Sequence, residues 1–180
     1  MQPNSVGVDS DSSQDAVAKV ARLTRAKQNQ FAESFAQIVA VFMRDRSFRA
    51  LPIGELEWMI LPPLMQGQFA LAHAPVPQGN GKGQGKKPTP HVPVALAVWA
   101  RVSPSIDKSL TEDLDTPIKL QPADWASGDN VWLLVLAGDQ RAHPRLLAQL
   151  CQTEFKGRQV KMRKRGPDGK IVVERIGASS

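Results

Sequence analysis

The sequence predicts an α+β domain built on a central, mostly antiparallel sheet. Three observations support this fold class. A long N-terminal segment carries apolar residues at helical spacing, two pairs of short segments have the pattern of hairpin strands, and one continuous apolar run is long enough for a strand covered on both faces. The chain has 180 residues, a length that fits a single domain with a real core.

The N-terminal region divides into a polar tail and a helix. Residues 1–13 are polar and rich in Ser and Asp, so we expect them to be disordered. From Gln14 to Met43 the pattern is helical. The apolar residues that recur there at helical spacing are Phe31, Phe35, Ile38 and Phe42. We therefore place a single domain over residues 14–180.

The middle of the chain predicts a helix and two antiparallel strands. Glu55–Leu61 has the pattern of a short helix, Gln68–His73 that of a strand, and His91–Val102 that of its hairpin partner. Residues 75–90 between the strands are rich in Pro, Gly, Gln and Lys. A connection of this length without its own structure is uncommon inside a domain, so a flexible loop is predicted.

The C-terminal half predicts two further helices, a buried strand and a hairpin. Ser105–Leu114 has the pattern of a short helix, and Trp132–Leu136 is the continuous apolar run. A helix with one apolar face starts near Pro144, because proline is favoured in the first turn. Arg158–Lys164 and Lys170–Ile176 then form a hairpin around a Pro-Asp-Gly turn.

Composition narrows the setting in which the protein works. A net charge of +6 and a sequence pI of about 9.8 favour acidic partners or surfaces. Cys151 is the only cysteine, which excludes an intrachain disulfide and makes a cysteine-based metal site improbable. No basic region feeds an apolar stretch at the N-terminus, and nothing reaches the roughly 18 apolar residues of a membrane span. We therefore expect a cytoplasmic protein without a membrane span and without a metal.

Several separate segments resemble one enzyme family, in the order and spacing that this family shows. Together they extend from about Arg44 to Ile176. The segments are Glu55–Leu64, Gly67–Leu71, Pro93–Ala100, Trp125–Trp132, Phe155–Arg158 and Pro167–Lys170. They resemble the RTX toxin-activating lysine acyltransferases, which are cytoplasmic bacterial enzymes. The resemblance implies a GCN5-related N-acetyltransferase-like fold, with helices that flank the central sheet.

The resemblance also implies an activity. Members of the family transfer a fatty acyl group from acyl carrier protein to internal lysines of an RTX protoxin. By this resemblance the partners are acyl carrier protein and an RTX-like target, with a homodimer possible. Acyl-acyl carrier protein is then the donor substrate, and no cofactor is bound permanently.

The chain departs from the family at the two positions that carry proton transfer. Alignment without gaps puts Phe48 where the family has its catalytic His, and Val135 where it has the Asp that supports that His. A lysine ammonium must lose a proton before it attacks a thioester, and neither Phe nor Val accepts one. Loss of a positioned general base costs on the order of 10²- to 10⁴-fold in rate. A weak or altered acyltransferase and a catalytically degenerate homologue that binds a carrier, an acyl chain or a protein are therefore both open.

Other residues of the resembling segments are expected around the former cleft. The residues that the resemblance assigns to the cleft or its support are Arg49, Trp99, Ser127, Gly128 and Asp129. We expect Phe48 and Val135 to face each other across the cleft, and Asp129 to accept hydrogen bonds from the backbone or from Arg49. Of the three histidines, His91 is the substitute base that the sequence suggests.

A basic cluster near the C-terminus is the predicted partner surface. Its members are Lys156, Arg158, Lys161 and Arg163. Alternation along a strand puts Lys161 and Arg163 on one face, which suits an acidic acyl carrier protein. An edge strand protected by solvated charge is the alternative. Nucleic acid is disfavoured, because no aromatic residue interleaves the cluster as a stacking platform.

Overall fold

The computed structural model describes residues 10–76 and 90–177, with side chains from residue 19 onward. Contacts divide the chain after Ser34 into two compact units, the second of which begins at Phe35. Helix α1 (Ser10–Arg44) spans this boundary and begins four residues before the predicted start at Gln14. The expected disordered tail lies outside the described residues up to residue 9, and the expected flexible loop over 75–90 does so for residues 77–89.

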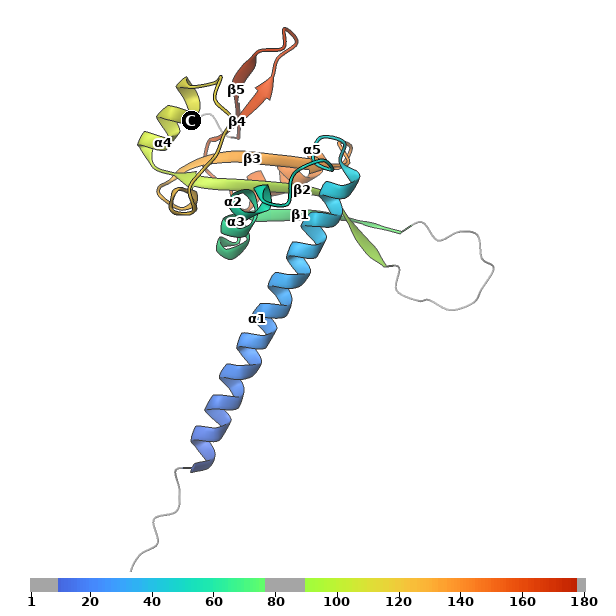
Figure 1. The fold of residues 1–180 in the computed structure, drawn as a ribbon, viewed down its shortest axis with the longest axis vertical. Coiled ribbons are helices and arrows are strands. Elements are labelled where there is room, and N and C mark those ends of the chain that lie inside the picture. Colours follow the sequence, from blue (N-terminus) through green and yellow to red (C-terminus); the bar gives the residue numbers. More distant parts are fainter. Residues whose placement is uncertain (1–9, 77–89, 178–180) are drawn as a thin grey trace, which may run out of the picture. The chain divides into compact units, whose positions relative to one another are not determined.

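The second unit contains one five-stranded sheet with the strands in chain order (Figure 1). The strands are β1 (Phe69–Pro75), β2 (His91–Val102), β3 (Asn130–Gly138), β4 (Val160–Arg165) and β5 (Ile171–Ile176). All neighbouring strands are antiparallel except β3 and β4, which are parallel. The prediction of an α+β fold on a mostly antiparallel sheet is confirmed, and the arrangement agrees with a GCN5-related N-acetyltransferase-like fold.

Short helices precede the first strand and connect later strands. They are α2 (Glu55–Met59), α3 (Leu61–Gln66), α4 (Pro104–Glu112), the 3-10 helix η1 (Pro122–Trp125) and α5 (His143–Gln152). The Leu-Pro-Pro sequence bends the chain at Ile60 and then starts α3, because prolines are tolerated in the first turn of a helix. Where the sequence predicted one helix and a break, the structure therefore has two helices.

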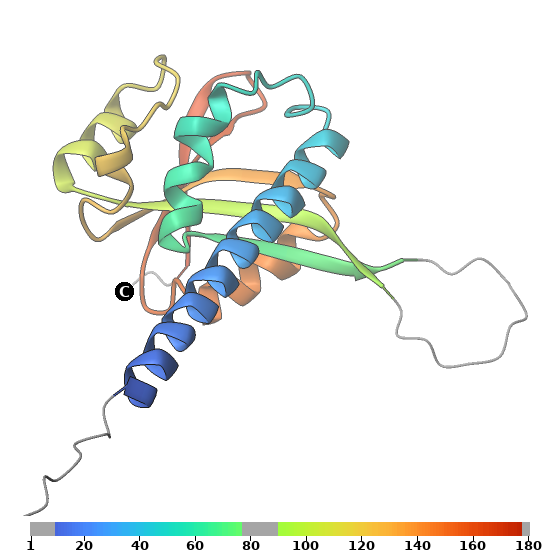
Figure 2. The same cartoon turned by 60° about the horizontal axis from the view of Figure 1, so that its bottom comes forward.

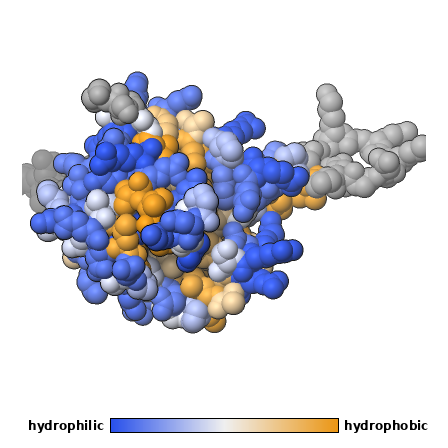
Figure 3. Space-filling model, turned by 90° about the horizontal axis from the view of Figure 1, so that it is seen from above, coloured by the Kyte–Doolittle hydropathy of each residue, from blue (hydrophilic) through white to orange (hydrophobic). Residues whose placement is uncertain are grey.

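Each face of the sheet carries an apolar cluster, and Figure 2 shows helices on both sides of the sheet. On one face, the end of α1 contributes Ile38, Val41 and Phe42, and α2 and α3 contribute further residues to the same cluster. On the other face, α5 contributes Leu146 and Leu150. The surface seen in Figure 3 is mostly hydrophilic, with apolar residues in separate patches. The core thus explains the buried strand β3, which is covered on both sides as its continuous apolar run predicts.

The pairing of β3 is uneven along its length. It pairs with β4 over three residues, from Val131 to Leu133, and its remaining residues extend past that pairing. The register with β2 shifts between Val98 and Trp99, which leaves Leu134 as an extra residue in β3. Such a bulge changes the direction in which the following side chains point. The bulge and the short parallel pairing together set the geometry at the C-terminal end of β3.

Candidate active-site pocket

A pocket of about 520 Å³ lies at the C-terminal end of β3. Two segments line it: residues 44–48, which run from the last residue of α1 into the following loop, and residues 138–143, which run from the last residue of β3 to the first of α5. The ionisable residues that line this pocket are Arg44, Asp45, Arg46, Asp139, Arg141 and His143. We call it the β3-end pocket.

One carboxylate joins the two loops. Asp45 Oδ2 accepts a hydrogen bond of 2.7 Å from the Gly138 backbone N–H, and its Oδ1 accepts one of the same length from Ser47 N–H. Gly138 has a φ of 95°, and a Cβ there would lie 2.2 Å from the Val94 carbonyl oxygen. Only glycine allows this close approach and this conformation. Asp45 and Gly138 therefore hold one wall of the pocket against the other.

The neighbouring strand β2 fixes the outer part of the same loops. Val94 is an extra residue in the β1–β2 register, and its carbonyl oxygen accepts a 2.8 Å hydrogen bond from Asp139 N–H. Arg44 Nη1 donates to the Pro93 carbonyl oxygen over 2.9 Å. The irregular position in β2 thus lies next to the pocket, as bulges often do beside functional sites.

Phe48 and Val135 both pack into the apolar cluster under α1. The ring of Phe48 stacks on Phe42 with 4.8 Å between centroids and lines the β3-end pocket at its edge. Val135 is 4 % exposed and does not line the pocket. The expectation that the two side chains face each other across an open cleft is wrong. Val135 belongs to the core cluster that Ile38 and Val41 of α1 also form, so these side chains surround it and the pocket does not reach it.

Asp139 and Arg141 form an ion pair at the mouth of the pocket. The guanidinium donates to both carboxylate oxygens, with Nε 3.0 Å from Oδ1 and Nη2 2.8 Å from Oδ2. These hydrogen bonds lower the pKa of Asp139 from 3.8 to about 2, and the nearby charge of His143 acts in the same direction. The pKa of Arg141 is raised by the same pairing. Asp139 is therefore ionised throughout the neutral range.

The structure brings a different histidine to this pocket from the one that the sequence suggested. His143 is the first residue of α5, and its Nε2 lies 3.2 Å from the Ala137 carbonyl oxygen. His91 is exposed at the start of β2, opposite Pro75, and does not line the pocket. His73 Nε2 lies 3.0 Å from Gln37 Oε1. One signal for His143 was present in the sequence, namely its place in the connection between a buried strand and a helix.

The Ser-Gly-Asp turn lies at the opposite end of β3 and supports the fold. Ser127 Oγ accepts from Ser103 N–H over 2.9 Å and donates to the Asp124 carbonyl oxygen. A Cβ on Gly128 would lie 2.5 Å from the Val102 carbonyl oxygen, so this turn packs tightly on β2. The side chain of Asp129 is 95 % exposed and lies 3.9 Å from Arg158. Our expectation of hydrogen bonds from the backbone or Arg49 is wrong, because the turn points this carboxylate into solvent.

The remaining residues of the predicted cleft lie apart from one another. Arg49 is exposed in the loop after α1. Trp99 is 4 % exposed, and its ring meets Phe155 edge to face at 5.2 Å. Trp99 and Arg158 also line a smaller cavity of about 260 Å³ beside Gln68. These residues do not gather around Phe48.

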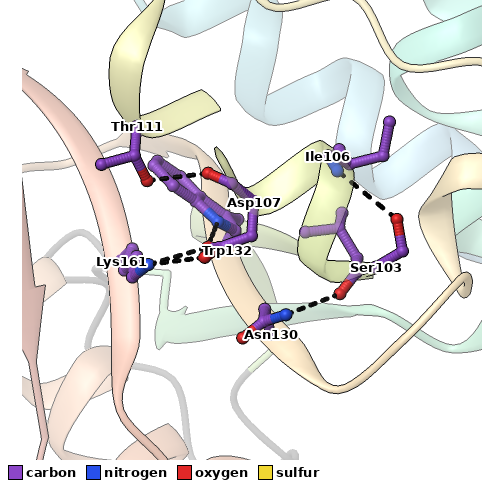
Figure 4. A network of polar contacts seen from close by, with 8 residues as sticks. Ser103, Ile106, Asp107, Thr111, Asn130, Trp132 and Lys161 are labelled. Atoms are coloured by element: carbon purple, nitrogen blue, oxygen red, sulfur yellow. Dashed lines mark hydrogen bonds and ion pairs between the residues drawn. The ribbon is translucent and has the colours of Figure 1, made fainter. Parts of the chain in front are cut away.

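Two residues of the predicted partner surface make contacts inside the domain. Lys161 Nζ lies 2.8 Å from both carboxylate oxygens of Asp107 (Figure 4). The Arg163 guanidinium donates to the carbonyl oxygens of Leu110, Asp113 and Thr116, and its pKa is lowered by burial. Lys156 is exposed and Arg158 is half-buried. Partner binding by this cluster stays a prediction, which now depends mainly on Lys156 and Arg158.

Two classes of site find no support in the part of the chain that the structure describes. Within residues 10–76 and 90–177, no three His, Cys, Asp or Glu side chains gather in a way that would hold a metal ion. No helix in those ranges combines the length and the apolar character that crossing a membrane requires.

Comparison with known proteins decides the family. A model of the RTX toxin acyltransferase family matches residues 86–176, a little over half of the chain. The chain belongs to the RTX toxin acyltransferase family. No curated protein matches it. The range matched to the family contains the loop from Gly138 to His143, whereas Phe48 lies before that range. The family resemblance of the sequence is therefore confirmed, and the β3-end pocket becomes the place to ask about acyl transfer.

Proposed function

We propose that the protein transfers a fatty acyl group from acyl carrier protein to a lysine of an RTX-like protein, and that it does so in the β3-end pocket. Membership of the RTX toxin acyltransferase family supports the reaction type. The single observation that supports the location is that an open, polar pocket of about 520 Å³ includes Phe48, the position of the family's catalytic histidine by resemblance.

Charge supports the choice of donor. The protein carries a net charge of +6, and Arg44, Arg46 and Arg141 line the pocket. An acidic carrier protein is attracted to such a surface, and oriented positive groups speed encounter. The carrier then binds at the mouth of the β3-end pocket, and Lys156 and Arg158 form a second contact region.

Transfer is tested directly with purified components. The protein is incubated with acyl-acyl carrier protein and an RTX-like target, and lysine acylation is followed by mass spectrometry. We expect acylated lysines that appear only when protein, donor and target are all present. Because Phe48 and Val135 cannot handle a proton, the rate is expected to be at least about 10²-fold below that of a relative with both polar residues. Absence of acylation over hours at high protein concentration would overturn the proposal.

The carrier contact has its own test. Reversing two charges in Lys156→Glu/Arg158→Glu should weaken binding to acyl carrier protein, and the wild-type affinity should fall as salt rises because exposed charges are screened over about 8 Å at physiological ionic strength. Lys108→Glu, an exposed cation on α4, is the matched control. Tighter binding to duplex DNA than to the carrier at two salt concentrations would contradict the choice of partner.

A non-catalytic role is the second candidate, and one observation favours it. Phe48 is stacked against Phe42 and Val135 is buried, so neither family position presents a proton acceptor to a substrate. In this case the protein binds the carrier, the acyl chain or the RTX-like target without turnover. Saturable binding of acyl carrier protein together with no acylated lysine would favour this role over transfer.

A further inference from the structure

The β3-end pocket holds one imidazole among its lining residues, and this side chain comes from a different segment of the chain than Phe48. His143 is the first residue of α5, directly after the loop that follows β3, whereas Phe48 belongs to the loop after α1. Both line the same cavity. A lysine that enters this cavity needs a group that accepts its proton near neutral pH, and imidazole is the side chain best suited to that task.

Local hydrogen bonding sets which nitrogen of His143 is available. Nε2 lies 3.2 Å from the Ala137 carbonyl oxygen. Because a carbonyl oxygen only accepts, Nε2 carries the hydrogen and donates it. In the neutral ring Nδ1 then has the free electron pair. The contact to β3 therefore fixes the ring in the tautomer that a general base requires, as a second hydrogen bond commonly does for histidine.

A carboxylate lines the same pocket as this imidazole. Asp139 lies four residues before His143 in the chain, and both residues line the β3-end pocket. An ionised carboxylate nearby stabilises the imidazolium that forms when His143 takes a proton. Hydrogen bonds from Arg141 and from its backbone N–H keep Asp139 in place. The pocket thus holds a His and an Asp, the same pair of residue types that the family resemblance assigns to other positions.

Further charges act on this site from both walls. The loop after α1 contributes Arg44, Asp45 and Arg46, the loop after β3 contributes Asp139 and Arg141, and α5 itself carries Arg145 two residues after His143. Asp45 is engaged with Gly138 and Ser47, and Asp139 with Arg141. The arginines leave the pocket with an excess of positive charge, which favours the neutral form of an incoming lysine amine.

We propose that His143 is the general base of acyl transfer in this protein and that Asp139 is its positioning residue. The inference rests on the proposed function. The target lysine ammonium gives one proton to His143 Nδ1, and the freed amine nitrogen attacks the thioester carbonyl carbon of the acyl donor. A C–N bond forms and the C–S bond breaks. The carrier thiolate takes the proton from the imidazolium, and the second ammonium proton leaves to water as the amide forms.

The experiment compares the wild type with His143→Gln, Asp139→Asn and His91→Gln in the acylation assay across pH. Glutamine keeps a donor for the Ala137 carbonyl oxygen and accepts no proton, whereas His91 is exposed outside the pocket and serves as the control. We expect His143→Gln to lower kcat/KM about 10²-fold or more at neutral pH, with His91→Gln unchanged. The rise of kcat/KM through the pH range in which imidazole loses its proton should disappear in His143→Gln.

The variant Asp139→Asn distinguishes a positioning role of Asp139 from a purely structural one. Removing the carboxylate should shift the rising part of the wild-type pH profile to lower pH, because the imidazolium loses a stabilising charge. A purely structural role for Asp139 would lower the rate at every pH and leave the profile in place. That result would overturn the role proposed for Asp139.

Failure of this inference is distinguishable from failure of the proposed function. If the wild type acylates lysine and folded His143→Gln keeps its rate and pH profile, His143 is not the base and the transfer function stands. If His143→Gln does not fold, the wild-type profile decides, since a kcat/KM that is flat through the imidazole range overturns the inference. Restoration of activity to folded His143→Ala by added imidazole supports it. Absence of transfer by the wild type overturns both proposals.

Discussion

The two ends of strand β3 differ in what their polar groups do. At the start, Trp132 Nε1 donates to Asp107 Oδ1 over 2.7 Å, and Lys161 pairs with the same carboxylate, so the polar groups satisfy one another (Figure 4). At the far end, the parallel pairing with β4 has stopped, and the loop from Gly138 to His143 lines an open pocket. The start of β3 therefore belongs to a closed network of polar contacts, whereas its end borders an open pocket.

The part of the sequence that is easiest to recognise is not the part that lines the pocket. The run from Trp125 to Trp132 is the most recognisable part of the chain, yet it builds the closed end. The residues of the pocket, such as Asp45 and His143, stand in short loops with little pattern. A family motif can thus report on the scaffold that holds a site without containing the residues that react.

The largest expected effect is at the closed end. Trp132→Ala removes a fully buried side chain and the donor to Asp107, so the free energy of unfolding should fall by about 3–5 kcal/mol. Chemical denaturation of the wild type and the variant measures the change. Trp132→Phe keeps most of the volume and should cost about 1–3 kcal/mol through the lost hydrogen bond. A loss below about 1 kcal/mol for Trp132→Ala would contradict the closed network.

At the open end, Gly138→Ala should also destabilise the protein. A Cβ at this φ of 95° meets the Val94 carbonyl oxygen at 2.2 Å, which adds a steric clash to backbone strain. We expect a loss of about 2–4 kcal/mol in chemical denaturation. Gly157→Ala is the matched control, because Gly157 also has positive φ and has no atom within 4 Å of the added Cβ. Equal losses in both variants would show that the close approach to β2 is unimportant.

The charge of Asp139 should give a smaller effect that depends on pH. Its folded pKa of about 2 is below the ordinary value of 3.8, so the ionised form is favoured in the folded state. The resulting stabilisation is fully present above pH 3.8 and is lost as the pH falls through about 2. A carbon-13 NMR titration of the carboxyl group measures this pKa. Arg141→Met should return it toward 3.8, and an unchanged value would exclude Arg141 as the cause.

The smallest expected effect is at the exposed carboxylate of the Ser-Gly-Asp turn. Asp129→Ala should change the free energy of unfolding by less than about 0.5 kcal/mol, because its side chain is 95 % exposed. Ser127→Ala should cost about 1 kcal/mol more, since the hydroxyl bonds both Ser103 and Asp124. Thermal and chemical denaturation of the two variants test this order. A larger loss of stability for Asp129→Ala than for Ser127→Ala would show that Asp129 supports the fold.

Much of the fold could be predicted from local pattern. The strand His91–Val102 has the predicted bounds, and the helix expected near Pro144 begins at His143. The C-terminal hairpin turns where its Pro-Asp-Gly sequence indicates, with Gly169 at a φ of 81°. These features depend on the conformational preferences of a few adjacent residues, so the sequence contains their cause directly.

The candidate site was predicted only in part. Phe48 lies in the pocket, as the resemblance suggested, but Val135 does not, and His91 is replaced there by His143. Val135 is buried among core side chains that include those of α1, a segment far from it in the chain, and no local pattern predicts that contact. Lys161 and Arg163 share one face as predicted, yet that face meets α4 and the segment after it.

By itself the sequence determined the order of helices and strands, the family and the basic character of this protein, because each depends on residues that are near neighbours or on simple totals. Tertiary structure alone decided which residues share the β3-end pocket. The hydrogen bond between Asp45 and Gly138 joins positions 93 residues apart, and it exists only because α1 and β3 pack on the same core. Contacts of that separation follow from packing, and no local pattern encodes them.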